Sequence, residues 1–261
     1  MNKKEIQKFD KAVAAFLKTH TKTIKSPEMR KKLKTMFSDT LLSYHVRAIS
    51  NGEPNAVFDM LRIIKKGAKR NLLNKNYYTK SFFKDNIPEL SKNKIFKMLL
   101  SDIYNLKQKG VGAGEVLFAL LFPSVRSPTG KTGDFVLAGK HIEIKSVVSA
   151  SSLKAHVNSS HRPTNRLFET IYDGHKKGSS NRQVWEGTKA QYHKFCKVVY
   201  PDFYNKKVFD RIFNKSDIKD KEQLLGYYIL KQYRKIDDFD KLVVLKLNGA
   251  DIEFLCINDL D

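Results

Sequence analysis

This chain contains few of the residues on which several protein classes depend. Its 261 residues include only two cysteines, Cys196 and Cys256, and one tryptophan. Two cysteines cannot complete a structural zinc site and do not indicate a disulfide framework, so we expect a reducing cytosol. No apolar stretch approaches the roughly 20 residues that span a bilayer. The N-terminus also lacks the apolar segment of a secretory signal. The composition therefore predicts a cytoplasmic globular protein that has no membrane partner.

Negative charge is also scarce, with 49 Lys and Arg against 27 Asp and Glu and a net charge of +22. Residues 1–110 hold 25 basic and 9 acidic side chains, and residues 151–221 hold 15 and 7. Residues 111–150 hold 4 and 3, whereas residues 222–261 hold 5 and 8. Basic flanks around a near-neutral centre fit a polyanion that the flanks hold and the centre processes. Nucleic acid fits better than a membrane surface, since no basic segment is strongly apolar on one side.

The forty residues from Val111 to Ala150 contain only three acids: Glu115, Asp134 and Glu143. Residues 134–145 alternate apolar and polar side chains around Ala138-Gly139. This alternation predicts a β-hairpin closed by a two-residue turn. Acids this sparse in so basic a chain indicate a specific role for the two in the hairpin.

The hairpin register predicts which side chains meet. A two-residue turn places Leu137 opposite Lys140 and therefore Asp134 opposite Glu143, with Lys145 on the same face as Glu143. Directly opposed carboxylates are destabilising unless a positive charge lies between them. Mg²⁺ suits that gap because it binds one or two carboxylates together with water and substrate phosphate. We therefore expect a Mg²⁺ site, in which Mn²⁺ substitutes.

Asp134, the spacer of eight residues and Glu143-Ile144-Lys145 resemble the PD-(D/E)xK nuclease superfamily, which includes restriction enzymes and Holliday junction resolvases. Glu115 resembles the additional acid that several members carry on the helix before the hairpin. The resemblance implies an α/β fold with a restriction-endonuclease-like mixed-sheet core. It also implies phosphodiester hydrolysis, with Asp134, Glu143 and Glu115 as metal ligands and Lys145 orienting water or stabilising charge. Gly133 departs from the pattern, because it replaces the proline that names the family.

Simpler interpretations of these residues remain open. Asp134 and Glu143 could be an exposed cross-strand pair neutralised by Lys131, Lys140 and Lys145. Glu115 starts an apolar run ended by Pro123, and a glutamate in a helix's first turn is stabilised by the macrodipole in any case.

Two histidine-containing groups also bear on the site. His141 lies on the acidic face of the hairpin, where a hydrogen-bonding neighbour is the more common role, and we leave it outside the site. A group of His156, Asn158 and His161 would suit an HNH-type nuclease, but recognisable flanking strands are missing.

The element pattern predicts three parts. Residues 1–110 form a basic helical region, residues 111–150 and 222–261 form the nuclease core, and residues 151–221 form a basic insertion lobe. Within these parts we expect helices near residues 10–17, 57–64, 91–106, 115–122 and 222–233, another beginning at Pro27, and strands at 242–247 and 252–257.

Two basic stretches supply the expected DNA-binding residues, while Arg30-Lys31-Lys32 is a further candidate for phosphate contacts. The first runs from Lys65 to Arg70 and could equally be a solvated helix face. The second, Gly174 to Arg182, is basic and glycine-containing and has the composition of a DNA-contacting loop, with an ordinary surface loop as the alternative. The expected DNA-binding residues are Lys65, Lys66, Lys69, Arg70, Lys176, Lys177 and Arg182.

The sequence therefore predicts a Mg²⁺-dependent deoxyribonuclease, an endonuclease whose partner is DNA and which could act as a homodimer. The alternative from another class is a non-catalytic DNA-binding or packaging protein that retains a nuclease-like core. Since lost activity usually shows as a missing acid or lysine, the complete set here favours catalysis. The excess of Lys over Arg is typical of AT-rich genomes, including many phages and mobile elements, which suggests the cytoplasm of a bacterium or of a phage-infected host.

Overall fold

A computed structural model describes residues 3–21, 27–105, 112–128, 133–147, 176–177, 184–185, 188–215 and 222–258. The chain divides into two compact units, which are described separately. Unit 1 comprises residues 1–154, 239–259 and 261, and unit 2 comprises residues 155–238 and 260. Among the described residues, no helix is long and apolar enough to cross a membrane.

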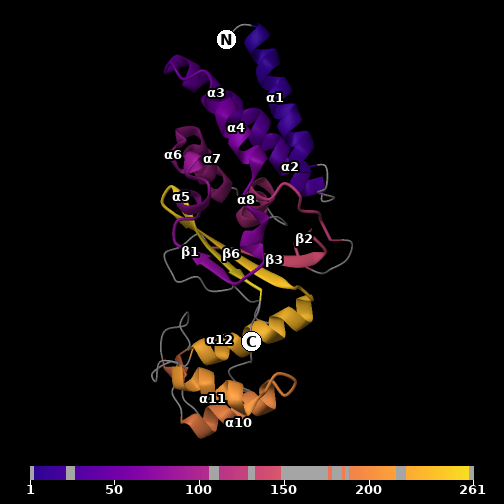
Figure 1. Ribbon diagram of the computed structural model, residues 1–261, viewed down its shortest axis with the longest axis vertical. Coiled ribbons are helices and arrows are strands. Elements are labelled where there is room, and N and C mark those ends of the chain that lie inside the picture. Colours follow the sequence, from indigo (N-terminus) through magenta and orange to yellow (C-terminus); the bar gives the residue numbers. More distant parts are fainter. Residues whose placement is uncertain are drawn as a thin grey trace. The chain divides into compact units, whose positions relative to one another are not determined.

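Unit 1 contains a five-stranded mixed sheet in the order β1-β7-β6-β3-β2 (Figure 1). Strand β3 runs parallel to β6, and the other neighbouring pairs are antiparallel. The expected α/β class with a mixed sheet is therefore confirmed. The strands are β1 (Tyr77–Thr79), β2 (Phe135–Leu137), β3 (Lys140–Val147), β6 (Lys241–Asn248) and β7 (Asp251–Ile257).

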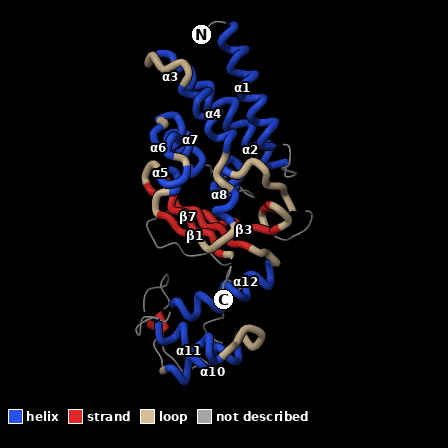
Figure 2. Tube along the Cα trace, in the orientation of Figure 1, coloured by secondary structure: helices blue, strands red, loops and turns tan. Residues whose placement is uncertain are grey.

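The described helices of unit 1 lie on one side of this sheet (Figures 1 and 2). They are α1 (Lys3–Thr21), α2 (Pro27–Thr35), the π-helical η1 (Met36–Thr40), α3 (Leu41–Ser50), α4 (Ala56–Lys66), the short 3₁₀ helix η2 (Arg70–Leu73), α5 (Phe82–Asn86), α6 (Pro88–Lys92), α7 (Lys94–Asn105) and α8 (Ala113–Leu121). Helix α8 packs directly on β3, and α5 packs on β7.

One hydrophobic core joins these helices to the sheet. Helix α4 buries Val57, Met60, Leu61 and Ile64, whose spacing places them on one helical face. Strand β7 buries alternate residues, as expected for a strand with one covered face. A single buried cluster extends from Phe9 of α1 through α8 to the end of β7. The N-terminal helices are thus part of the unit that contains the sheet.

Unit 2 has its own aromatic core. Its described elements are the paired strands β4 (Lys176–Lys177) and β5 (Val184–Trp185) and the helices α10 (Lys189–Val199), α11 (Lys206–Lys215) and α12 (Glu222–Asp237). The core is formed by Tyr192, Phe195, Cys196, Tyr200, Phe209 and Tyr228.

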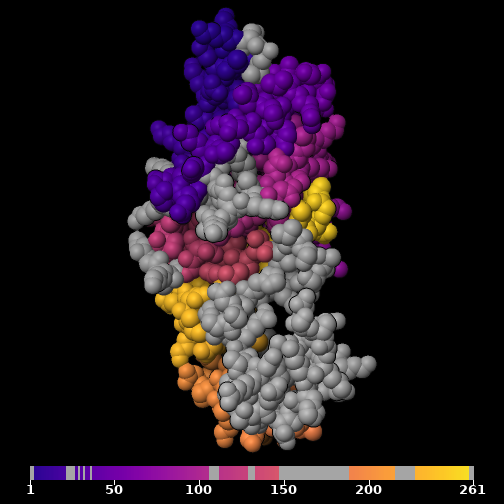
Figure 3. Space-filling model, turned by 180° about the vertical axis from the view of Figure 1, so that it is seen from behind, coloured from indigo at the N-terminus to yellow at the C-terminus, as the bar shows by residue number. Residues whose placement is uncertain are grey.

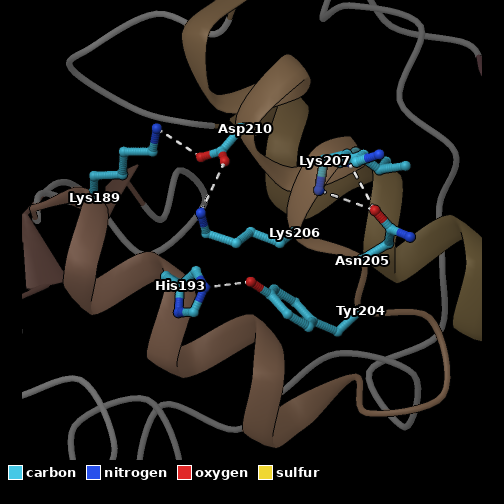
Figure 4. A network of polar contacts seen from close by, with 8 residues as sticks. Lys189, His193, Tyr204, Asn205, Lys206, Lys207 and Asp210 are labelled. Carbon is cyan, nitrogen blue, oxygen red and sulfur yellow. Dashed lines mark hydrogen bonds and ion pairs between the residues drawn. The ribbon is translucent and has the colours of Figure 1, made fainter.

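Polar contacts hold α10 to α11 and to the turn between them (Figure 4). Asp210 lies 2.6 Å from Lys189 and 3.9 Å from Lys206, and these contacts lower the pKa of its carboxyl. The Tyr204 hydroxyl is hydrogen-bonded to Nε2 of His193. Phe209 of α11 belongs to the aromatic core, and Phe203 and Tyr204 pack against it.

The structure departs from the sequence-based division in two places. Residues 222–261 were expected to belong together, but α12 packs on α11 and contributes Tyr228 to the core of unit 2. The boundary of unit 1 instead lies at Phe239, after Asp238 has taken a left-handed conformation with φ of 46°. Residues 77–79 were expected within a helical region, yet they form edge strand β1.

Candidate active site

The β2–β3 hairpin has the predicted turn. Leu137 pairs with Lys140, and the intervening Ala138 and Gly139 have φ of 52° and 77°. Two positive φ values are typical of the type I′ turn, whose twist matches that of the flanking strands. Residues of this hairpin form part of the surface in the view of Figure 3, where they are coloured pink to salmon.

Side chains alternate across the hairpin as the period of two requires. Phe135, Leu137, Ile142 and Ile144 are 1%, 7%, 0% and 4% exposed and belong to the helix-covered core. Glu143 is only 7% exposed although it lies on the opposite face. A carboxylate this buried carries a desolvation cost unless it is paired.

Lys145 supplies that pairing. Its Nζ lies 2.5 Å from Oε1 of Glu143, and the two side chains are 26% and 9% exposed. Residues two apart on a strand share a face, so this contact follows directly from the Glu-x-Lys spacing. The shared face of Glu143 and Lys145 was predicted, and their direct ion pair was not.

Asp134 is positioned differently from the prediction. The regular ladder begins at Phe135 and Ile142, so Asp134 does not form a ladder pair with Glu143. Its N–H donates to the Ile142 carbonyl at 2.9 Å, and its Oδ2 accepts the N–H of Ile144 at 2.7 Å. This departure resembles a β-bulge, in which an extra residue re-aims a side chain. Asp134 thus contacts the backbone on both sides of Glu143.

Gly133 causes this departure. Its φ is +60°, and a Cβ at this position would lie 3.0 Å from the Ile142 carbonyl oxygen. Proline holds φ near −65° and cannot adopt this conformation. Glycine therefore stands where the family pattern has proline because this backbone turns through the left-handed region.

Glu115 lies in the first turn of α8. Its Oε1 accepts the N–H of Gly112 at 2.9 Å, which satisfies one donor at the helix N-terminus. The expected helix-start role is therefore present. The negative charge of Glu115 also raises the pKa of Asp134, so capping the start of α8 does not prevent Glu115 from acting on Asp134.

The pKa of Asp134 shows that the acids share one environment. Burial, together with the negative charges of Glu143 and Glu115, raises this pKa to about 7. The N–H of Ile144 and the charge of Lys145 oppose the increase. The charges of Glu115 on α8 and of Glu143 and Lys145 on the hairpin thus all act on Asp134.

The donor set suits a hard divalent cation. Carboxylate oxygens are the ligands that Mg²⁺ prefers, and it commonly uses one or two of them with water and phosphate. Across the described ranges, no group of three or more His, Cys, Asp or Glu side chains is placed so as to hold a metal ion. A cation here would therefore be held by fewer than three of these side chains, such as Asp134 and Glu143, and completed by water and substrate.

Two neighbouring groups considered from sequence have other contacts. The main-chain N–H of His141 donates to Oδ2 of Asp240 at 2.8 Å, and Lys140 lies 3.4 Å from Oδ1 of the same carboxylate. Lys140 is thus directed to Asp240 and not to the site. Lys131 and the group of His156, Asn158 and His161 lie outside the described residues.

The first basic stretch belongs to the same unit as the site. Lys65 and Lys66 end α4, and Arg70 hydrogen-bonds to Ser124, just beyond the C-terminus of α8. The N–H of Ala68 donates to the carbonyl of Leu121 at 2.7 Å. Six residues of helix separate Leu121 from Glu115, a rise of roughly 9 Å. Lys69 precedes η2 in the same stretch.

The second basic stretch belongs to unit 2. Lys176 and Lys177 form β4, which pairs with Val184 and Trp185 of β5. Arg182 lies outside the described residues. Lys176 and Lys177, which were expected in a loop, therefore lie in a short two-stranded ribbon.

Sequence reasoning missed the residues that set the spacing of the site. Gly114 and Ser146 are in close contact where α8 crosses β3, and the left-handed Gly133 re-aims Asp134. The signal was the Gly112-Ala113-Gly114 sequence directly before Glu115, which is unusual at the start of an apolar helix. Comparison with known proteins adds no family assignment, since no family, curated protein or solved structure matches the chain.

Proposed function

We propose that this protein is a Mg²⁺-dependent DNA endonuclease with a restriction-endonuclease-like core and a PD-(D/E)xK-type site. The proposal is carried by the buried Glu143–Lys145 ion pair on β3 and by Asp134, which is bonded to the backbone on both sides of Glu143 and feels the charges of Glu143, Glu115 and Lys145. Burying carboxylates that interact unfavourably with one another is costly in a folded protein. Functional sites are where such arrangements are concentrated.

Each residue has a distinct task in this proposal. Asp134 and Glu143 would hold the cation, and Glu115, which does not form a three-acid ligand group with them, would orient a metal-bound water. Bound Mg²⁺ would supply Lewis-acid stabilisation of the phosphate and a more acidic water. Lys145 offers three donors and a fixed charge, so it could shift from Glu143 to the attacked phosphate when substrate enters.

The charge of the chain supports DNA as the substrate. The net charge is +22, and the stretch from Lys65 to Arg70 is anchored at one end of α8 while Glu115 lies at the other. Lysines and arginines at this distance could hold phosphates flanking the cleaved bond. Charge does not separate DNA from RNA, so both substrates belong in the test.

Cleavage of nucleic acid with Mg²⁺, Mn²⁺ or EDTA tests the proposal. Supercoiled, linear, single-stranded and branched DNA, with RNA of matched length, would be incubated with wild type and with an Asp134→Ala/Glu143→Ala double variant. We expect wild-type cleavage of DNA with either metal and none in EDTA. Cleavage that persists in EDTA, or equal cleavage by the double variant, would refute the proposal. Metal-independent DNA binding without cleavage would instead support the non-catalytic alternative.

A further inference from the structure

Helix α8 approaches β3 closely at Gly114. A Cβ built on Gly114 would lie 2.8 Å from Cβ of Ser146 and 3.2 Å from Cγ2 of Ile144. Carbon atoms normally pack at about 3.5–4.0 Å. Cβ of Ser146 is attached directly to the backbone, so rotating the side chain cannot relieve the contact. Any side chain at position 114 would therefore push α8 and β3 apart by about 1 Å.

This contact also determines where Glu115 lies. Glu115 directly follows Gly114, and its carboxylate is tied to the start of α8 by the N–H of Gly112 at 2.9 Å. Ser146 directly follows Lys145 on the strand that carries Glu143. A movement of α8 at Gly114 would therefore move Glu115 relative to both hairpin acids.

A side chain at position 114 would favour the helix itself. Glycine in a helix costs roughly 0.5–1 kcal/mol relative to alanine. The first turn of α8 forgoes this stabilisation at the residue before Glu115. The close approach to Ser146 is the structural reason for glycine here.

We propose that Gly114 and Ser146 are positioning residues whose contact sets the position of Glu115 relative to Asp134 and Glu143, and thereby the affinity of these two acids for a cation. The inference rests on the proposed function and specifies how its third acid is placed. A purely structural role for the contact would affect the stability of unit 1 alone. A positioning role would lower cation affinity, and would do so only while Glu115 is present.

The test measures Mn²⁺ binding to the metal-free, full-length protein by calorimetry, with cleavage as a second measurement. We expect Gly114→Ala to weaken Mn²⁺ binding by about 10–100-fold, as is typical when a group that orients a metal ligand is lost. Adding Ser146→Gly removes the opposing Cβ and should restore most of the affinity. Ser146→Thr adds a methyl on the other side of the contact and should weaken binding less, which provides a milder variant if Gly114→Ala folds poorly.

Two controls separate positioning from lost stability. In a Glu115→Ala background, Gly114→Ala should cause no further loss of Mn²⁺ affinity, because coupled residues are not additive. Gly249 has φ of +60° and no atom within 4 Å of its added Cβ, so Gly249→Ala strains the β6–β7 turn without a steric contact. That variant should lose stability and keep its Mn²⁺ affinity.

The outcomes distinguish this inference from the proposed function. Wild-type affinity in Gly114→Ala, or an equal loss with and without Glu115, would overturn the positioning role and leave the metal site standing. Absence of Mn²⁺ binding by the wild-type protein would overturn both. The positioning role would be established if Ser146→Gly restores the Mn²⁺ affinity of Gly114→Ala and if Gly114→Ala has no effect on Mn²⁺ affinity in the Glu115→Ala background.

Discussion

Replacing Asp134 with asparagine tests whether its carboxylate is held against like charges. In the metal-free protein, burial and the charges of Glu143 and Glu115 raise its pKa from 3.8 to about 7. The folded chain then keeps a proton that the unfolded chain has released. The free energy of unfolding therefore falls as pH rises between about 4 and 7, and is insensitive to this group outside that window.

The size of the effect follows from the two pKa values. The difference between 3.8 and about 7 corresponds to about 4 kcal/mol, at about 1.4 kcal/mol per pH unit. The Asp134 side chain keeps some contact with solvent, and screening lowers the expected figure to about 2–4 kcal/mol. Asparagine retains an oxygen that can accept the N–H of Ile144. The variant should therefore be more stable than wild type by this amount at pH 8 and nearly equal to it at pH 4.

Hydrogen exchange of amides in β3 and β6, in the presence of EDTA, is the appropriate assay. It reports the opening free energy of unit 1, whereas fluorescence of Trp185, the one tryptophan, would report on unit 2. Asp240→Asn is the matched control, for which the expected change in stability has the opposite sign. Hydrogen bonds from His141 and Lys140 lower the pKa of Asp240, so its stabilising contribution is present above the unfolded pKa and lost as pH falls through the folded pKa. That variant should lose stability at pH 8.

Mg²⁺ provides the second arm of the same experiment. A cation at the site neutralises the repulsion, so wild type should gain stability with Mg²⁺ at pH 8 through preferential binding to the folded state. Asp134→Asn should gain much less. Equal opening free energies of the variant and wild type at pH 8 in EDTA would refute the picture of a carboxylate under repulsion. Equal stabilisation of both by Mg²⁺ would place the cation elsewhere.

Three further outcomes are expected. Asp134→Ala or Glu143→Ala should abolish DNA cleavage but leave DNA binding, measured by fluorescence anisotropy, largely intact. Lys145→Ala should slow single-turnover cleavage by on the order of 10² or more. Cleavage rates equal to that of wild type would contradict these roles. Gly133→Ala should lower the opening free energy of the hairpin by about 1–3 kcal/mol through its left-handed φ, which hydrogen exchange of β3 would detect and unchanged protection would contradict. DNA affinity should fall with salt at a log–log slope of roughly −0.9 per neutralised phosphate, and substituting the basic residues between Lys176 and Arg182 should flatten it; an affinity insensitive to salt would contradict backbone binding.

Local pattern predicted much of unit 1. The two-residue turn, the buried face of the hairpin, helix α8 and the final pair of strands all follow from apolar periodicity and glycine placement. The conformation of Asp134 did not follow, because a bulge depends on the φ of Gly133, and glycine permits several values. Edge strand β1 was missed because three residues are too short for a periodic signal.

Helix α12 shows a second feature that sequence patterns do not predict. Its apolar residues predict an amphipathic helix correctly, but they do not say which core the helix packs against. Tyr228 belongs to the aromatic cluster of unit 2, an association that depends on residues of α10 and α11 far from it in sequence. The role of Glu115 was inferred from a family resemblance, and the close contact between Gly114 of α8 and Ser146 of β3 was not predicted from the sequence.

The parallel pairing of β3 with β6 has a consequence for folding. Strand β3 ends at Val147, and its partner begins only at Lys241, after the whole of unit 2. Pairing of strands so far apart in sequence slows folding, because the chain loses loop-closure entropy before the strand contacts that offset this loss can form. During synthesis, β3 would have an open edge until β6 and β7 emerge, and such edges favour aggregation. We expect unit 2 to fold first, with the strand that bears Glu143 and Lys145 becoming rigid only after its late partner has docked.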